Sequence, residues 1–351
     1  MLIKTKIVFL FFVLFFALSF GQNNFQKIDS IAHTIRYKGD LNQLVFDLTQ
    51  NLDNEKIDKT RAIYSWITDN ISYDYKLFNK GRKSIKLKCK NKKDCDIKRK
   101  EYENKIIEKV LRKRKGICSG YSLLFKRMCD IAKITCISID GYVKTNSRHV
   151  GNTGILDHAW NAVIIDGQTY LLDLTWASGY CEKDENKKLK NFVKKKNDFY
   201  WFTPADKFTI DHFPKNPEKV LNFDIPKDYY KNQPYIENSI IPFIEILNPK
   251  QGVIITKVND SIVFKFKYSK EIKKLQINTN LKRNPKFYST NKKREKVFNR
   301  KAFDKQEYID FEKNNDDYNF SYKIEKENLK YIEILFDYNL KLKYLVKIEQ
   351  N

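Results

Sequence analysis

The chain has 351 residues, 42% of them hydrophobic, and a formal net charge of +24 at pH 7. That length allows one large or two ordinary domains, and the hydrophobic content is enough for a real core. After the N-terminal segment no second apolar run of membrane length occurs, which argues against further membrane spans.

The N-terminus has the pattern of a secretory signal peptide. Lys4 and Lys6 precede an apolar run, Ile7–Phe20, and Ser19 and Gly21 are small residues at the −3 and −1 positions of a cleavage site. We therefore expect residues 1–21 to be removed and the mature chain, with a net charge of +22, to be secreted or periplasmic and without a transmembrane anchor. An uncleaved anchor remains the alternative, because the lengths of the two kinds of segment overlap.

Residues 26–78 have a helical pattern. Asp53 and Asn54 can cap a helix whose apolar stripe contains Ile63, Trp66 and Ile67. A charged insertion follows at about residues 80–100, and Tyr102–Arg114 is again helical, with an apolar face at Ile106, Ile107, Val110 and Leu111.

Positive charge is concentrated around this insertion. Residues 80–115 contain 17 Lys and Arg against 5 Asp and Glu, a net of +12. The surface either binds an anionic partner, such as a cell-envelope polymer, or is simply a solvated face. No aromatic interleaving or nucleic-acid motif accompanies the charge, so we expect no nucleic acid. Cys89 and Cys95 are close enough in sequence to bridge.

Cys118 follows the helix end at Gly116 and precedes an apolar helical pattern, which places it at or near a helix N-terminus. Free backbone N–H groups and the positive end of the helix dipole favour a thiolate there. If Cys118 stays free, five cysteines remain, an odd number, so a full disulfide framework is not implied. Pairs with metal-ligand spacing are absent and the four His do not cluster, so we expect neither a metal nor a cofactor.

Strands follow at Ile134–Val143, Ala159–Ile165 and Thr169–Thr175. Asp166 and Gly167 form a two-residue hairpin loop between the last two, which pairs Ile165 with Gln168. Continuing that ladder would pair His158 with Thr175 and place Asp173 diagonally opposite His158, within reach of its imidazole. The result is a candidate base with an orienting acceptor downstream of a candidate nucleophile.

The remaining sequence predicts a second domain. A polar loop runs from Trp176 to about Lys196, and the first domain closes near residue 225. Residues 226–250 are irregular and are predicted to be a linker. From residue 251 short alternating strands predict a β-sandwich of immunoglobulin type, with strands at residues 261–268, 272–279, 318–324, 331–338 and 341–348.

Three motifs together resemble the transglutaminase-like superfamily: Lys115–Tyr121, Asp157–Val163 and Tyr170–Trp176. Two downstream motifs, Trp201–Asp206 and Asp211–Pro214, are similar to the branch that includes kyphoscoliosis peptidase and a fungal cytokinesis protein. The resemblance implies an α+β fold, with a papain-like core of helices packed on an antiparallel sheet over residues 22–225.

The resemblance also implies a Cys-His-Asp triad in which Cys118 is the nucleophile, His158 the base and Asp173 the orienting acid. Such a triad carries out acyl transfer on a protein or peptide, either amide hydrolysis or transamidation. Trp66 and Tyr73 are candidates for a second oxyanion donor, and Trp160 for a site wall. The alternative function is a non-catalytic scaffold or binding protein of the cell envelope.

Overall fold

The computed structural model describes residues 25–52, 56–81, 87–184, 186, 188–290 and 295–349. The predicted signal peptide, and the cap at Asp53 and Asn54, lie outside the described residues. The chain divides into two compact units, each made of discontinuous segments. Unit 1 comprises Met1–Asp140, His158–Pro204 and Glu218–Asn222, and unit 2 comprises Gly141–Asp157, Ala205–Pro217 and Phe223–Asn351. Within the described ranges, no helix combines the length and apolar character needed to cross a bilayer.

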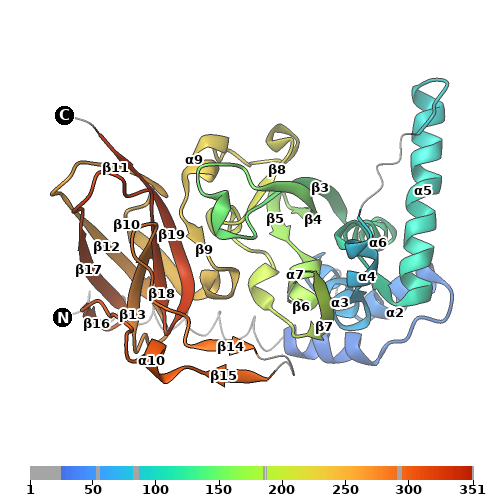
Figure 1. Cartoon of the computed structure of the whole chain (residues 1–351). Helices are drawn as coiled ribbons and strands as arrows, with labels where there is room; N and C mark the ends of the chain where they lie inside the picture. Colours follow the sequence, from blue (N-terminus) through green and yellow to red (C-terminus); the bar gives the residue numbers. More distant parts are fainter. Residues whose placement is uncertain are drawn as a thin grey trace, which may run out of the picture. The chain divides into compact units, whose positions relative to one another are not determined.

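The longest helices of the described chain lie in unit 1 (Figure 1). After a helical segment at residues 25–34, its helices are α2 (Leu41–Thr49), α3 (Lys56–Asn70), α4 (Tyr75–Asn79), α5 (Lys92–Lys113), α6 (Cys118–Ile131) and α7 (Leu174–Ser178). The predicted stripe of α3 is buried, as is the apolar face of α6, which includes Tyr121, Leu124 and Phe125. The helix predicted at Tyr102 begins ten residues earlier, at Lys92, so part of the predicted insertion is helical.

A four-stranded antiparallel sheet has the strand order β5-β4-β3-β8. Its members are β3 (Thr135–Val143), β4 (Ile155–Ile165), β5 (Gln168–Leu172) and β8 (His212–Pro214). A short parallel pair joins β1 (Ser72–Tyr73) to β2 (Lys115–Gly116). The stretch predicted as a loop after Trp176 instead forms a hairpin of β6 (Gly179–Lys183) and β7 (Leu189–Lys194). Helices and antiparallel sheets together confirm the α+β class.

Two sheets of unit 2 form the predicted sandwich. One has the order β10-β12-β17-β16 and the other β11-β19-β18-β13, with β9 added to β19. The strands are β9 (Tyr235–Ile236), β10 (Ile244–Asn248), β11 (Val253–Thr256), β12 (Ser261–Tyr268), β13 (Leu275–Thr279), β16 (Glu312–Asn314), β17 (Asp317–Lys323), β18 (Tyr331–Phe336) and β19 (Asn339–Ile348). Rings of the two sheets meet in the core: the centroids of Phe264 and Tyr344 lie 5.2 Å apart.

The predicted linker at residues 226–250 is wrong, because these residues are folded into unit 2. They form α9 (Lys227–Asn232), β9, a 3-10 helix (Asn238–Phe243) and β10. Lys144 holds this segment: its buried ammonium donates to the carbonyls of Tyr230, Lys231 and Gln233. Burial lowers the pKa of Lys144 to about 7. The sequence did not reveal that this segment is folded, because hydrogen bonds from an ammonium to backbone carbonyls produce no periodic pattern of residues.

The remaining short elements connect these parts. They are the 3-10 helices Ser147–His149, Asp198–Tyr200 and Pro217–Lys219, the helices α8 (Ala205–Phe208) and α10 (Arg300–Phe303), and the ribbon of β14 (Tyr288–Thr290) and β15 (Lys296–Phe298).

Candidate active site

Cys118 is the first residue of α6, as predicted, and its side chain is buried. The residue before it, Ile117, makes no side-chain cap for the helix. The approach to Cys118 is fixed by β2, in which Gly116 pairs with Tyr73 of β1. A Cβ at Gly120 would lie 2.8 Å from Val110 Cγ2 of α5, so α5 and α6 pack too closely there for a larger residue.

Asp173 is a helix cap and a hydrogen-bond acceptor at the same time. Its Oδ1 accepts from the backbone N–H groups of Thr175 and Trp176, at 2.8 and 3.2 Å, and so caps α7. Its Oδ2 lies 2.6 Å from Nε2 of His158. Each oxygen therefore has a separate task, and the carboxylate, which is fully buried, is held in one orientation.

His158 lies on β4, between this carboxylate and Cys118. Burial alone would lower the pKa of the imidazole, but the charge and hydrogen bond of Asp173, together with its interaction with Cys118, raise the pKa to about 10. Because Nε2 is engaged by Asp173, Nδ1 is the ring nitrogen left for the thiol. The structure thus brings all three predicted triad residues together.

The route by which His158 and Asp173 meet differs from the predicted ladder. The hairpin loop is as expected: Ile165 pairs with Gln168, and Asp166 and Gly167 both have positive φ. The ladder ends, however, at Asn161 and Leu172, and Thr175 belongs to α7. The predicted pairing of His158 with Thr175 is therefore wrong. Asp173 instead contacts the imidazole from the N-cap position of α7, where its other carboxylate oxygen caps the helix.

Aromatic rings line the imidazole. The centroids of Trp176 and Trp160 lie 5.2 and 6.0 Å from that of His158, each at an interplanar angle of 33°. Trp160 is buried, so it is a packed wall. Tyr73 is half-buried in β1 and pairs with Gly116. Gly116 precedes Cys118 by two residues in the chain.

Trp66 does not suit the role of oxyanion donor. Its indole N–H donates to the carbonyl of Ile35 at 3.0 Å, and its ring is fully buried with the Arg114 guanidinium 5.2 Å from its centroid. An N–H committed to a backbone carbonyl is not available to a substrate, so this expectation is corrected. Of the two proposed donors, Tyr73 remains a prediction.

Two hydrogen bonds between α6 and β4, close to the site, were not predicted from the sequence. Ser122 Oγ, one turn after Cys118, donates to the carbonyl of Trp160 at 3.0 Å. In return, Asn161 Nδ2 donates to the carbonyl of Ser122 at 3.1 Å. These reciprocal hydrogen bonds join α6, which begins at Cys118, to β4, which carries His158. The motif Asp157–Val163 contains Asn161, but its partner is set by tertiary packing.

The geometry of the pair is that of an acid–base contact. A carboxylate and an imidazole are also common metal ligands, each about 2.0–2.2 Å from a zinc ion. Here the two atoms that would bind such an ion, His158 Nε2 and Asp173 Oδ2, are only 2.6 Å apart and are joined directly. This arrangement orients the imidazole, as the acidic third member of a catalytic triad does.

Comparison with known proteins shows which family this part of the chain is similar to. Residues 42–173 match the model of the transglutaminase-like superfamily, and this range contains Cys118, His158 and Asp173. Kyphoscoliosis peptidase of Mus musculus is 34% identical over 222 residues, covering 60% of this chain and 30% of that protein. The Homo sapiens protein of the same name is 33% identical over 230 residues, covering 62% and 31%. Cytokinesis protein 3 of Schizosaccharomyces pombe is 26% identical over 155 residues, covering 44% and 16%.

Among solved structures, one of a TGase is similar, with 18% sequence identity and a TM-score of 0.26, covering 46% of this chain and 35% of the other. The chain spans less than a third of the length of the two kyphoscoliosis peptidases, so the similarity concerns only part of those proteins. The matched family model identifies a transglutaminase-like domain at residues 42–173, and this part of the chain is similar to kyphoscoliosis peptidase.

Proposed function

We propose that this protein is a cysteine-dependent acyl-transfer enzyme that acts on a protein or peptide. The observation that carries the proposal is the buried contact of 2.6 Å between His158 and Asp173, beside Cys118 at the start of α6. An imidazole whose pKa is raised to about 10 is a cation at neutral pH and can hold the proton that a thiol loses.

The reaction follows from these positions. Cys118 Sγ attacks the carbonyl carbon of an amide, while His158 retains the thiol proton. The backbone N–H of Cys118 at the helix start is one donor to the developing oxyanion. His158 then gives its proton to the leaving nitrogen, the C–N bond breaks, and an amine or ammonia departs from a thioester on Cys118.

Two acceptors can release the acyl group. Attack by water gives a carboxylic acid and regenerates the thiol, which is amidase or peptidase activity. Attack by a lysine amine gives a new amide, which is transamidation. Since the triad serves both reactions, the identity of the acceptor decides between them.

We further propose that the protein is exported. The predicted signal peptide at residues 1–21 is the basis, and the disulfide between Cys89 and Cys95, which was expected from their spacing, supports an oxidising compartment. Among the cysteines that the structure describes, Cys118, Cys129, Cys136 and Cys181 are not joined in disulfides.

The test uses a library of Gln-containing peptides, with and without a primary amine, read by mass spectrometry. Hydrolysis of the side-chain amide adds about one mass unit, cleavage of the chain gives two fragments, and transamidation adds the amine with loss of ammonia. We expect one of these products with the wild type and none with Cys118→Ala. Products formed equally by both proteins would contradict the proposal, and a Cys118→Ala protein with full biological effect would favour a scaffold.

A further inference from the structure

A strongly basic surface lies at the N-terminal end of α5, and we call residues 88–100 the basic tip. It contains seven basic residues, Lys88, Lys90, Lys92, Lys93, Lys98, Arg99 and Lys100, against two acidic ones, Asp94 and Asp96. All the basic side chains are exposed except Lys98, which is half-buried. The catalytic chemistry described above uses none of them.

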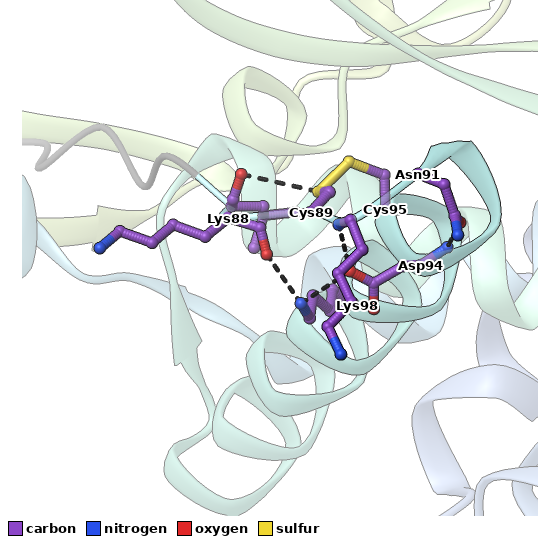
Figure 2. The surroundings of a disulfide bond; sticks show 8 residues. Lys88, Cys89, Asn91, Asp94, Cys95 and Lys98 are labelled. Carbon is purple, nitrogen blue, oxygen red and sulfur yellow. Dashed lines mark hydrogen bonds and ion pairs between the residues drawn. A yellow bond between two sulfur atoms is a disulfide. The ribbon is translucent and has the colours of Figure 1, made fainter.

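The basic tip has a defined shape (Figure 2). The Cys89–Cys95 disulfide closes it, and Asn91 caps α5 by accepting from the backbone N–H of Asp94 at 2.9 Å. Lys98 Nζ bridges the Asp94 carboxylate at 2.8 Å and the Lys88 carbonyl at 2.7 Å. The charges are therefore displayed on a braced end and not on a loose chain, which reduces the entropy lost when a partner binds.

These charges do not serve the stability of the helix. Lys92 and Lys93 stand in the first turn of α5, where the positive end of the helix dipole disfavours a positive charge. Within the described part of the chain, Lys98 is the one member of the seven that forms a salt bridge. The others leave a net positive field directed at solvent, which is the electrostatic requirement for an anionic partner.

The opposite end of the same helix supports the active site. Ile107, Val110 and Leu111 are the buried residues of α5, and Val110 packs against Gly116 and Gly120 on either side of Cys118. At 1.5 Å per residue, the 17 residues from Lys93 to Val110 span about 26 Å. A polymer held at the basic tip would thus be kept at a set distance from the nucleophile.

We propose that the basic tip binds an anionic polysaccharide, carrying carboxylate or sulfate groups, with which the acyl substrate is associated. Six of the seven basic residues are lysines, flexible point charges that suit anions spaced along a pliable chain. The tip contains no aromatic residue on which bases could stack, which disfavours single-stranded nucleic acid. Its exposed apolar residue, Ile97, does not make the apolar face that membrane insertion needs.

Binding is measured with the full-length mature chain carrying Cys118→Ala, so that the result is independent of the proposed catalysis. The probe is polygalacturonate, with neutral dextran, duplex DNA and anionic lipid vesicles as comparisons. The tip variant combines Lys90→Gln, Lys92→Gln, Lys93→Gln, Arg99→Gln and Lys100→Gln, and leaves the braced Lys98 unchanged. The matched control removes five exposed charges further along the chain: Lys105→Gln, Lys109→Gln, Arg112→Gln, Lys113→Gln and Lys115→Gln.

We expect the parent protein to bind polygalacturonate at about 0.05 M salt and to release it at about 0.5 M, where screening shortens the reach of the charges. The tip variant should bind at least about tenfold more weakly, because it loses most of the local field, and the control should change by less than about twofold. Equal weakening in both variants, or undiminished binding by the tip variant, would overturn the proposal. So would tighter binding of DNA or vesicles than of polygalacturonate. The second part of the proposal, that the acyl substrate is associated with the polysaccharide, rests on the acyl-transfer function. It is tested separately by comparing KM for a peptide linked to the polymer with KM for the same peptide alone.

Discussion

At the scale of single residues, the site depends on the separate hydrogen bonds that the two carboxylate oxygens of Asp173 make. One oxygen caps α7 and the other holds the imidazole of His158. Asp173→Asn should keep the cap of α7, since Asn is as good a cap as Asp, so any loss in the free energy of unfolding should come from the missing charge beside the buried imidazole. Because the amide has no charge, the pKa of His158 should fall and acyl transfer should drop by about 10²- to 10⁴-fold. Activity close to that of the wild type would contradict this role.

The pH dependence that His158 confers has a definite sign. Its pKa in the folded protein, about 10, is above the ordinary value of 6.5. Its contribution to stability is therefore complete below about pH 6.5 and is lost as the pH rises through about 10. Over the same pH window the imidazolium beside Cys118 loses its proton, which acyl transfer needs for the leaving nitrogen. The free energy of unfolding and the rate of acyl transfer should therefore decline together.

Single residues also show what the sequence could predict. Cys118 and His158 could be singled out because each stands in a motif with a clear local structure. Asp173 was singled out from a strand ladder that in fact ends at Leu172, so its proximity to His158 was predicted but the route was not. Ser122 and Asn161 could not be found in this way. Their hydrogen bonds depend on how α6 packs against β4, which no local spacing encodes. The indole of Trp66 was misassigned for the same reason, because its acceptor is 31 residues away.

At the scale of elements, the two hydrogen bonds between α6 and β4 should hold the nucleophile and base in register. Asn161→Ala leaves the buried carbonyls of Ser122 and Ile137 without this donor, which should cost about 1–3 kcal/mol in unfolding free energy. It should also slow acyl transfer in the fraction that remains folded. Thr68→Val is the matched control, because it removes a buried hydrogen bond within α3. Equal effects of the two variants on turnover would show that Asn161 has only a structural role.

The contact between α5 and α6 can be tested by adding one carbon. Gly120→Ala would place a Cβ 2.8 Å from Val110 Cγ2, so the Val110 side chain or one of the two helices must shift. We expect a loss of about 1–3 kcal/mol in unfolding free energy, measured by urea titration. Adding Val110→Ala makes room and should recover part of that loss. Strictly additive losses in the double variant would contradict a direct clash.

At the scale of the whole molecule, the units are not consecutive in sequence. The predicted boundary at residues 226–250 was wrong, because β10 and the segment held by Lys144 belong to unit 2. Sequence patterns gave the sandwich strands well, since strand alternation is local. They did not show that residues 141–157 and 205–217 belong to the same unit as the sandwich, because that depends on contacts such as Gly151 with Leu345.

This interleaving predicts the effect of a truncation. A chain that ends at Lys250 lacks Val253 and Leu345, against which Gly151 packs. Hydrogen exchange should therefore become faster in residues 141–157 and 205–217 than in the full chain, whereas α3 and α6 of unit 1 should keep more of their protection. Unchanged protection in these two segments would show that the first 250 residues fold as an independent domain.

The measurement that tests the central claim most directly is the rate of Cys118 alkylation against pH, in the wild type and in His158→Ala. Anionic iodoacetate and neutral iodoacetamide are compared, and the site is identified by peptide mass. Because an adjacent imidazolium attracts the anionic reagent, the wild type should favour iodoacetate by at least about tenfold until the pH approaches 10. His158→Ala should lose that preference, together with most of its reactivity at neutral pH. An unreactive Cys118, or equal rates and preference in the two proteins, would contradict a catalytic pair.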